Sequence, residues 1–285
     1  MEGSITDQTS LTRAFSEAKI ETVFHLAAQA SARPDAAPLA YTQETNFTGP
    51  RLLLDACRAH AVSRVVVASS MRLYRTPLPS VVNESSPVNP TDLVHLSHLY
   101  CEVLLAEHRR RDIMRAGKEP ETSDRHQAPL RSVAARMGII HGISPVMKTD
   151  PKFLAAPQFF CLQAARGQTL DVNTGPETEL TFLHIDDAVE ALMRCVDLPV
   201  DVPVVNVAAE VRSVASVAAA VQRAGAARGL DVRVDYHGEH GPDASRSIES
   251  ALDSTEFRPT RRIEQSIGDV LDYYIAEGAD HCASS

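Results

Sequence analysis

Short apolar runs alternate along the chain with longer segments in which apolar residues recur every three or four positions. The short runs are rich in β-branched residues and flanked by polar ones, as in buried strands, and they cover 23–28, 64–70, 132–140 and 203–208. The longer segments predict helices over 41–61, 90–117, 186–197, 211–229 and 262–276. Because strands alternate with helices long enough to cross over a sheet, the pattern predicts an α/β fold built on a parallel sheet.

Composition narrows the class of protein. A chain of 285 residues with 44% hydrophobic content is long enough for one large core, or for a core with a smaller lobe. The net charge of −9 argues against a nucleic-acid-binding surface. The basic run 109–111 is expected to be a solvated helix end, and the charged segment 117–129 an exposed loop.

The cellular setting is inferred from three absences in the sequence. The chain has no apolar run long enough for a membrane span, and its first residues, MEGSITDQTS, do not resemble a signal peptide. Its five cysteines are scattered without a CxxC pair, which favours free thiols. We therefore expect a cytoplasmic protein without a membrane partner.

The segment DLVHLSHLYCE, residues 92–102, holds the most unusual chemistry. On a helix, His95, His98 and Glu102 fall close to one stripe, because positions three and four apart are neighbours. That spacing allows a metal site, a proton-transfer pair or replacements without a chemical role. We expect no metal here and keep the other two possibilities open.

Five stretches in a fixed order carry a family resemblance that runs from about Gly3 to Tyr274. They are ETVFHLAAQAS, NFTGPRLLLDACRAHAVSRVVVASSMRLY, ARMGIIHG, TFLHIDDAVEAL and LDSTEFRPTRRIEQSIGDVLDYY. Together they resemble the extended short-chain dehydrogenase/reductase (SDR) superfamily, the NAD-dependent epimerase/dehydratase family. The resemblance implies a Rossmann-type sheet that binds a nicotinamide dinucleotide, a C-terminal lobe for a nucleotide-linked sugar, and a Ser/Thr-Tyr-Lys catalytic set.

The fold expected from this resemblance is an incomplete Rossmann-like parallel sheet with flanking helices and a smaller C-terminal substrate lobe. The core is assigned to 1–140 and 181–208, and the lobe to 141–180 and 209–285. The alignment places Met1 in the loop after the family's third strand. It therefore predicts that the first strand-helix units and their glycine-rich phosphate loop are missing, and that a sheet edge is exposed.

The same alignment leaves the cofactor open. The family implies NAD(P), yet the chain offers only isolated glycines, none in a strand-turn-helix phosphate loop. We therefore assign no cofactor. If a dinucleotide does bind, the resemblance implies contacts from Asp7, Ala27 and Ala28.

The catalytic set is altered as well. Ser70 matches the family's polarising Ser or Thr, but Val94 stands at the tyrosine position and His98 at the lysine position. Valine cannot exchange a proton, so the expected catalytic residues are Ser70 and His98. The residues expected to contact substrate are Ser69, Met71, Arg72, Tyr74, His95, His141 and Arg246.

Three functional hypotheses follow. The favoured one is an isomerase- or lyase-like enzyme acting on a small sugar-like or natural-product molecule without standard NAD(P) hydride transfer. The second is an NAD(P)-dependent nucleotide-sugar epimerase, dehydratase or reductase with a missing N-terminus. The third is a non-catalytic module that binds a small molecule or a protein. The resemblance further implies a homodimer through helices 41–61 and 90–117.

Overall fold

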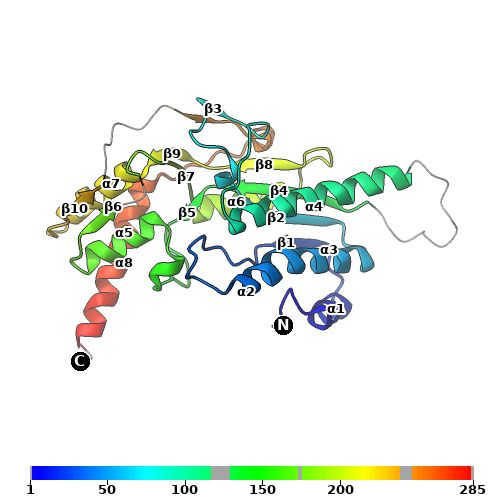
Figure 1. Cartoon of the computed structure of the whole chain (residues 1–285), viewed down its shortest axis with the longest axis horizontal. Coiled ribbons are helices and arrows are strands. Elements are labelled where there is room, and N and C mark those ends of the chain that lie inside the picture. The colour runs from blue at the N-terminus through cyan, green and yellow to red at the C-terminus, as the bar shows by residue number, and fades with distance from the viewer. Residues whose placement is uncertain (1, 117–128, 173–174, 238–245, 284–285) are drawn as a thin grey trace.

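A four-stranded parallel sheet forms the centre of the molecule (Figure 1). The computed structural model describes residues 2–116, 129–172, 175–237 and 246–283. In these residues the sheet order is β1-β2-β4-β8, with all pairs parallel. The strands are β1 (Thr22–His25), β2 (Arg64–Ser70), β4 (Arg131–Met137) and β8 (Val204–Val207). Within the described part β1 pairs only with β2, so it lies at an edge of the sheet.

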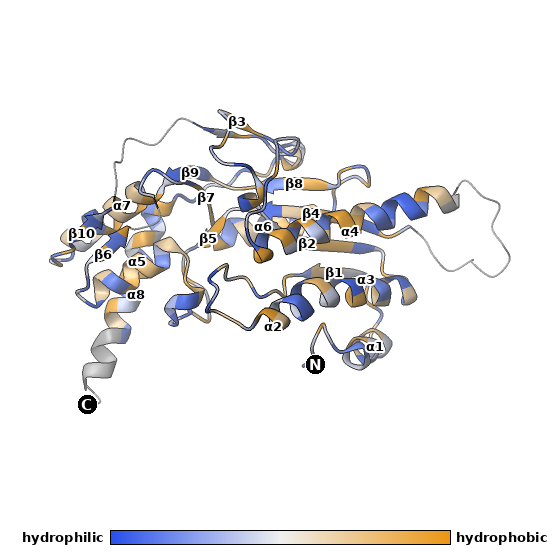
Figure 2. Ribbon diagram, in the orientation of Figure 1, coloured by the Kyte–Doolittle hydropathy of each residue, from blue (hydrophilic) through white to orange (hydrophobic). Residues whose placement is uncertain are grey.

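Helices cover both faces of this sheet because successive residues of each strand point to opposite sides. Val65 and Val67 of β2 join the core with α1 (Gln8–Glu17), α3 (Gly49–Ala59) and α4 (Leu93–Ala116). Val66, between them, packs toward α6 (Ile185–Cys195) on the other face. Figure 2 shows the hydrophobic character of these central strands.

A second lobe is built around a separate hydrophobic core. Its three helices are α5 (Ala156–Ala165), α7 (Val214–Ala226) and α8 (Ile263–Ala283). A parallel pair, β6 (Leu170–Val172) and β10 (Val234–Tyr236), lies beside them. A three-stranded sheet of β5 (Ile139–His141), β7 (Glu179–His184) and β9 (Glu210–Ser213) connects this lobe to the central sheet.

Short elements complete the connections. α2 (Leu39–Gln43) continues through a π-helical turn, Glu44–Thr48, into α3, so the predicted helix 41–61 is nearly continuous. Turns of 3-10 helix cover Met71–Leu73, Pro151–Phe153 and Ala251–Thr255. A small pair joins β3 (Val81–Val82) to β11 (Ser247–Ile248).

The predicted fold class, an α/β Rossmann-like parallel sheet with flanking helices, is confirmed, but several element boundaries were wrong: the strand predicted over 23–28 ends at His25, and the helix predicted over 262–276 continues to Ala283. The helix expected over 211–229 begins only at Val214, because the preceding residues pair antiparallel with β7. The strand expected over 132–140 is interrupted at Gly138, where the chain passes from the central sheet into the second one. The sequence patterns also missed α1, α5 and β7 as separate elements.

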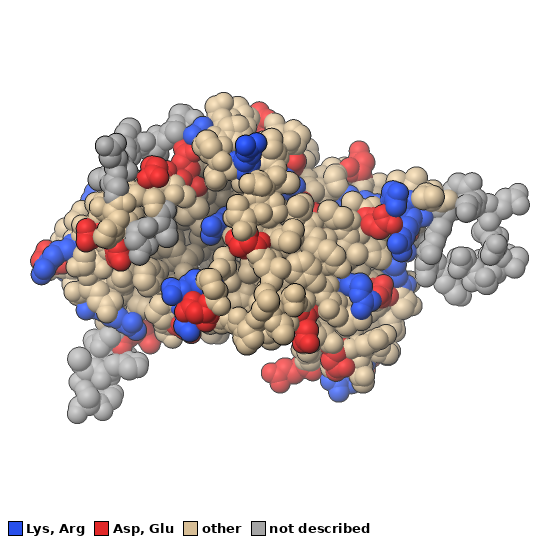
Figure 3. All heavy atoms as spheres, in the orientation of Figure 1, with Lys and Arg blue, Asp and Glu red and all other residues tan. Residues whose placement is uncertain are grey.

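The charged surface follows the sequence prediction in part. Acidic and basic side chains are interspersed over the face shown in Figure 3. Arg110 and Arg111 are exposed and pair with Glu107, but Arg109 is not a solvated residue: its guanidinium donates to the carbonyls of Ser132 and Pro203. Most of the predicted loop 117–129 lies outside the described residues. No described helix combines the length and the apolar character that crossing a membrane requires.

Candidate functional site

The candidate site lies where β1 and β2 end and α4 begins. His25 is the last residue of β1 and Ser70 the last of β2. Since parallel strands place their carboxyl ends at one edge of the sheet, the two residues share that edge. The first turns of α4 bring His95 and His98 to the same place, as the electrostatic coupling of His98 to both His25 and His95 shows. We call His25, His95 and His98 the histidine cluster.

Asp92 fixes His95 with both of its carboxylate oxygens. Oδ1 accepts a hydrogen bond from the His95 backbone N–H at 3.0 Å, which caps the start of α4. Oδ2 bonds to the ring at Nδ1. A carboxylate only accepts, so the proton sits on Nδ1 and the lone pair is left on Nε2. Such a pair has the geometry of an oriented general base.

Burial keeps the histidine cluster neutral. His95 is 7% exposed, and burial lowers its pKa, an effect that the Asp92 carboxylate opposes and the positive charge of Arg72 reinforces. Burial also lowers the pKa of His98, and the charge of His95 adds to that shift. The pKa of His25 falls to about 4, again through burial and then through His98. All three rings are therefore uncharged near neutral pH and able to accept a proton.

Ser70 and Arg72 stand beside this cluster at the end of β2. Ser70 Oγ accepts the Arg72 backbone N–H at 3.1 Å and so caps the turn Met71–Leu73. Because Oγ accepts in this bond, its hydroxyl proton remains available to a substrate oxygen. Arg72 is exposed, and its positive charge contributes to lowering the pKa values of both Asp92 and His95.

Ser69 and Tyr74 belong instead to a buried hydrogen-bonded network. Ser69 Oγ donates to Glu102 Oε1 at 2.6 Å, and Arg136 forms a two-pronged ion pair with Glu102 at 2.9 and 2.7 Å. Tyr74 OH donates to Asn206 Oδ1 at 2.6 Å and accepts from Arg136 at 2.8 Å. Both hydroxyls are committed to this network, and burial raises the pKa of the Tyr74 phenol. Met71, 2% exposed, lies in a small hydrophobic cluster with Tyr74.

This network also bears on the metal hypothesis. Glu102 is held by Ser69 and Arg136, whereas His95 is held by Asp92, so their ligating atoms serve different partners. Within the described residues no group of three or more His, Cys, Asp or Glu side chains has the arrangement of a metal site.

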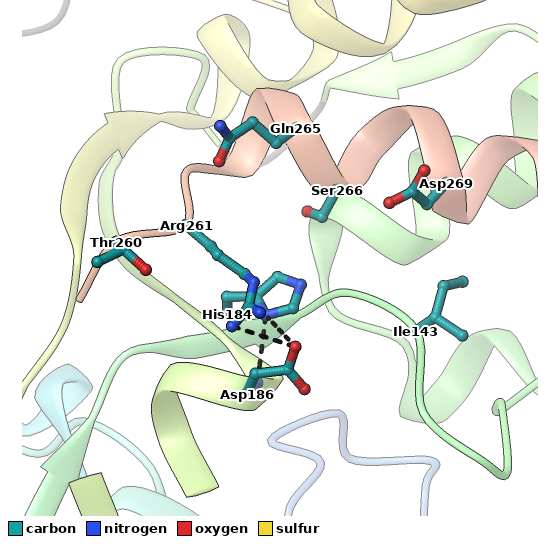
Figure 4. Close-up of a pocket in the computed structure, with 8 residues that line it drawn as sticks. All are labelled: Ile143, His184, Asp186, Thr260, Arg261, Gln265, Ser266 and Asp269. Atoms are coloured by element: carbon teal, nitrogen blue, oxygen red, sulfur yellow. Dashed lines mark hydrogen bonds and ion pairs between the residues drawn. The ribbon is translucent and has the colours of Figure 1, made fainter. Parts of the chain in front are cut away.

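His141 lies outside the histidine cluster, next to His184 and Ser266. Its Nδ1 bonds to Ser266 Oγ at 2.6 Å, and its ring meets that of His184 edge to face at 5.4 Å. Burial and then His184 lower the pKa of His141 to about 4. Figure 4 shows the cavity of about 550 Å³ beside them, with Arg261 reaching Asp186 at 3.2 Å. It is lined by Ile143, His184, Asp186, Thr260, Arg261, Gln265, Ser266 and Asp269.

The remaining predicted contacts are dispersed. Arg246 pairs with Glu179 at 2.8 Å in the second lobe. Asp7 caps α1 by accepting the backbone N–H groups of Thr9 and Ser10. Ala27 and Ala28 are exposed just after β1. Of the predicted site residues, the structure thus gathers Ser70, Arg72, His95 and His98.

The family alignment did not select Asp92 and His25, which lie at the same end of the sheet as the four residues named above. Asp92 carries a signal that sequence alone provides: an aspartate three residues before a histidine at a predicted helix start fits both a cap and a side-chain pair. His25 carried none, because its neighbour His98 is far away along the chain.

The residues at the nicotinamide-facing positions do not fit that group. The family's lysine offers a permanent charge to the cofactor ribose, whereas burial lowers the pKa of His98 and leaves it neutral. Val94, at the tyrosine position, is 5% exposed and has no proton to exchange. Asp7, the expected adenine contact, uses its carboxylate to cap a helix.

Comparisons with known proteins relate the chain to one family. Residues 1–118 match the model of the NAD dependent epimerase/dehydratase family. UDP-glucose 4-epimerase of Bacillus subtilis is 30% identical over 107 residues, which are 37% of this chain and 31% of that protein. D-erythronate dehydrogenase of Cupriavidus necator is 29% identical over 167 residues, 55% of this chain and 51% of that protein. The chain thus spans between about a third and half of the length of these curated relatives.

Solved structures resemble the whole chain in fold. A UDP-glucose 4-epimerase of Thermus thermophilus in complex with NAD superposes with a TM-score of 0.74 at 22% identity, covering 95% of this chain and 83% of its own. A UDP-glucose 4-epimerase of Thermotoga maritima with UDP-glucose gives 0.76 at 19% identity, covering 97% and 84%. The match to the NAD dependent epimerase/dehydratase family thus covers residues 1–118, and the chain as a whole shares the Rossmann-like fold of these solved epimerases.

Proposed function

We propose that the protein is an epimerase- or dehydratase-like enzyme that acts on a small, sugar-like molecule by acid–base chemistry, without standard nicotinamide hydride transfer. The observation that carries this proposal is the hydrogen bond between Asp92 and His95 beside Ser70. The sugar-nucleotide and sugar-acid names of the relatives support the substrate class. The altered positions Val94 and His98 argue against the family's own proton relay.

The arrangement suits a redox-neutral proton shift. His95 Nε2 takes a proton from a carbon beside a substrate carbonyl, and the electron pair moves onto the carbonyl oxygen. The Ser70 hydroxyl donates a hydrogen bond to that oxygen while its charge develops. The protonated His95, stabilised by Asp92, then returns the proton to the carbon or to its neighbour. His98 lies next in the cluster and is proposed to relay protons, since its charge is coupled to that of His95.

Titration with nicotinamide dinucleotides tests the cofactor part of the proposal. We expect no saturable heat of binding for NAD(H) or NADP(H) at the NAD concentrations that saturate the Thermus thermophilus UDP-glucose 4-epimerase, solved in complex with NAD and run alongside. The reason is that neutral His98 and buried Val94 replace the groups that would hold the nicotinamide half. Stoichiometric binding by this chain would favour an NAD(P)-dependent epimerase instead.

We further propose that the protein is a homodimer through the helical face of α2, α3 and α4. Large apolar side chains are exposed there: Leu39 is 65% exposed, Tyr41 54%, Leu96 45% and Val103 59%. Exposed large apolar side chains favour association when a partner can cover them. Because it occurs on helices that resemble the family's pairing helices, a second copy of the chain is the proposed partner.

Light scattering after size exclusion checks the dimer. Val103→Glu is expected to shift the protein from dimer to monomer, since it would bury a carboxylate at the interface. Val189→Glu on α6, where valine is 55% exposed, is the matched control and is expected to remain dimeric. A monomeric wild-type protein at micromolar concentration contradicts the proposal.

A further inference from the structure

The cavity of about 550 Å³ beside His184 shares no residue with the histidine cluster. Its volume lies within the usual range of small-molecule sites, about 300–1,000 Å³. It is bounded by the start of α6, the first turns of α8 and, on a third side, Ile143 (Figure 4). We propose that this cavity is a second binding site, which takes a polyhydroxylated ring that carries a protonated amine, as an amino sugar does. The inference does not depend on the acid–base chemistry proposed at His95.

His184 offers a hydrogen-bond donor to a ligand in the cavity. It precedes α6, and its Nδ1 accepts the backbone N–H of Asp186 at 3.2 Å. Because a ring nitrogen that accepts carries no proton, the proton of this ring is on Nε2. No described group accepts a hydrogen bond from Nε2, and the residue beside it is Gly142, where a Cβ would lie 2.6 Å away. A ligand hydroxyl can therefore accept this N–H.

Ser266 offers an acceptor from α8. Its Oγ lies 3.1 Å from the Ile263 carbonyl, and since a carbonyl only accepts, the serine proton is used in that bond. His141 Nδ1, 2.6 Å from the same Oγ, is then the donor to it. A hydroxyl oxygen has two lone pairs, so one remains for a ligand. The donor on His184 and the acceptor on Ser266 together suit sugar hydroxyls, which both donate and accept.

The charges of the lining favour a cationic ligand. Two aspartates and one arginine line the cavity, so the lining carries one net negative charge. Arg261 is already paired, with Asp186 at 3.2 Å and with Asp187 at 3.8 Å. Asp269, in contrast, is exposed and forms no ion pair in the part of the chain that the structure describes. An ammonium group can pair with Asp269, whereas a phosphate would find no unpaired cation in this lining.

Asp269 is also placed to act together with Ser266. The two residues are three positions apart on α8, so they share one face of the helix, and Figure 4 shows both on the side of His184. Arg228 does not neutralise Asp269, because its guanidinium is held by both carboxylate oxygens of Asp272, at 2.6 and 2.8 Å. A ligand that donates hydroxyls to Ser266 can therefore place an ammonium group at Asp269.

NMR titration of the full chain with three monosaccharides tests the proposal. D-glucosamine, D-glucose and D-glucose 1-phosphate carry an ammonium group, no charge or a phosphate on the same ring. We expect D-glucosamine to shift the ring signals of His184 saturably. Its affinity should exceed that of D-glucose by about fivefold, the size of effect expected for an exposed ion pair. D-glucose 1-phosphate should leave the His184 signals unchanged.

Variants of two lining residues locate the interaction. Asp269→Asn should remove the preference for the amine, so that D-glucosamine binds no more tightly than D-glucose. The matched control is Asp201→Asn, at an exposed aspartate that does not line the cavity, and it should keep the preference. His184→Asn retains an oxygen that caps α6 but lacks Nε2, so it should weaken both sugars, as measured on the sugar signals.

Four results would each overturn the inference. The first is equal affinity for the three sugars, or no binding of any of them. The second is movement of the His95 and His98 signals without movement of His184, which would place the sugar at the acid–base site instead. The third is an amine preference that survives Asp269→Asn or is lost equally in Asp201→Asn. The fourth is sugar binding that His184→Asn leaves unchanged.

Discussion

His95→Gln is expected to lower kcat/KM by about 10²- to 10⁴-fold, the usual contribution of a general base. The amide keeps hydrogen-bonding capacity but has no ring lone pair that accepts a proton near neutral pH. The measurement is steady-state turnover of the substrate found by screening small sugar-like molecules. His237→Gln, at an exposed surface histidine with a 54% exposed side chain, should retain wild-type turnover.

Asp92→Asn tests whether Asp92 acts by orienting the ring of His95, the proposed base. An asparagine oxygen can still cap α4, but its amide nitrogen donates toward the ring, so Nδ1 must accept and the proton moves to Nε2. Turnover should fall although the helix start is kept. The pKa of His95 should fall further as well, because Asp92 raises it against the effect of burial.

The pH dependence of kcat/KM tests the direction in which the pKa of His95 is shifted. The base acts when neutral, and its pKa lies below the ordinary 6.5, so the acid limb of kcat/KM is expected below that pH. In Asp92→Asn the limb should move to still lower pH. An unchanged limb and unchanged turnover in both variants would show that His95 is not the base.

Glu102→Gln is expected to reduce the free energy of unfolding by about 3–5 kcal/mol, the usual cost of leaving a buried ion without its partner. The side chains of Glu102 and Arg136 are only 6% and 7% exposed, so water cannot replace the lost charge. Ser69 would lose an ionised acceptor at the same time. Urea denaturation followed by circular dichroism measures the change.

The control replaces a glutamate in an exposed pair. Glu190 and Arg194 lie one turn apart on α6 with side chains 53% and 51% exposed. Glu190→Gln should change stability by less than about 1 kcal/mol, because solvent screens such pairs. Similar losses in the two variants would mean that the Glu102–Arg136 pair contributes no more than a surface pair does.

The sequence predicted those parts of the fold that depend on local pattern. The strand 64–70 has the observed bounds, since its β-branched run is short and buried on both faces. The helix 211–229 was predicted to start too early because Val211 to Ser213 have no local preference that reveals pairing with β7. Such pairing is set by residues distant in sequence, which periodicity does not report.

The same distinction applies to the site. The family resemblance selected Ser70 and His98, the helical spacing drew attention to His95, and the helix start brings Asp92 to His95 through local geometry. The roles of Tyr74 and His141 could not be predicted, since their partners Asn206 and Ser266 lie 132 and 125 positions away. The sequence does not show that the Tyr74 hydroxyl and the His141 ring are already hydrogen-bonded to these distant partners.

Gly138 lies between β4 and β5, where the chain passes from the central sheet into the three-stranded sheet. Its backbone N–H bonds to Val207 of the central sheet at 2.8 Å, while a Cβ there would approach the backbone of Thr181 and Phe182 to 3.1 Å. An alanine at this position would therefore make unusually tight contacts, and the neighbouring backbone would have to shift by a few tenths of an ångström. The absence of a side chain at residue 138 thus lets the central sheet and the three-stranded sheet approach each other closely at the point where the chain passes from one to the other.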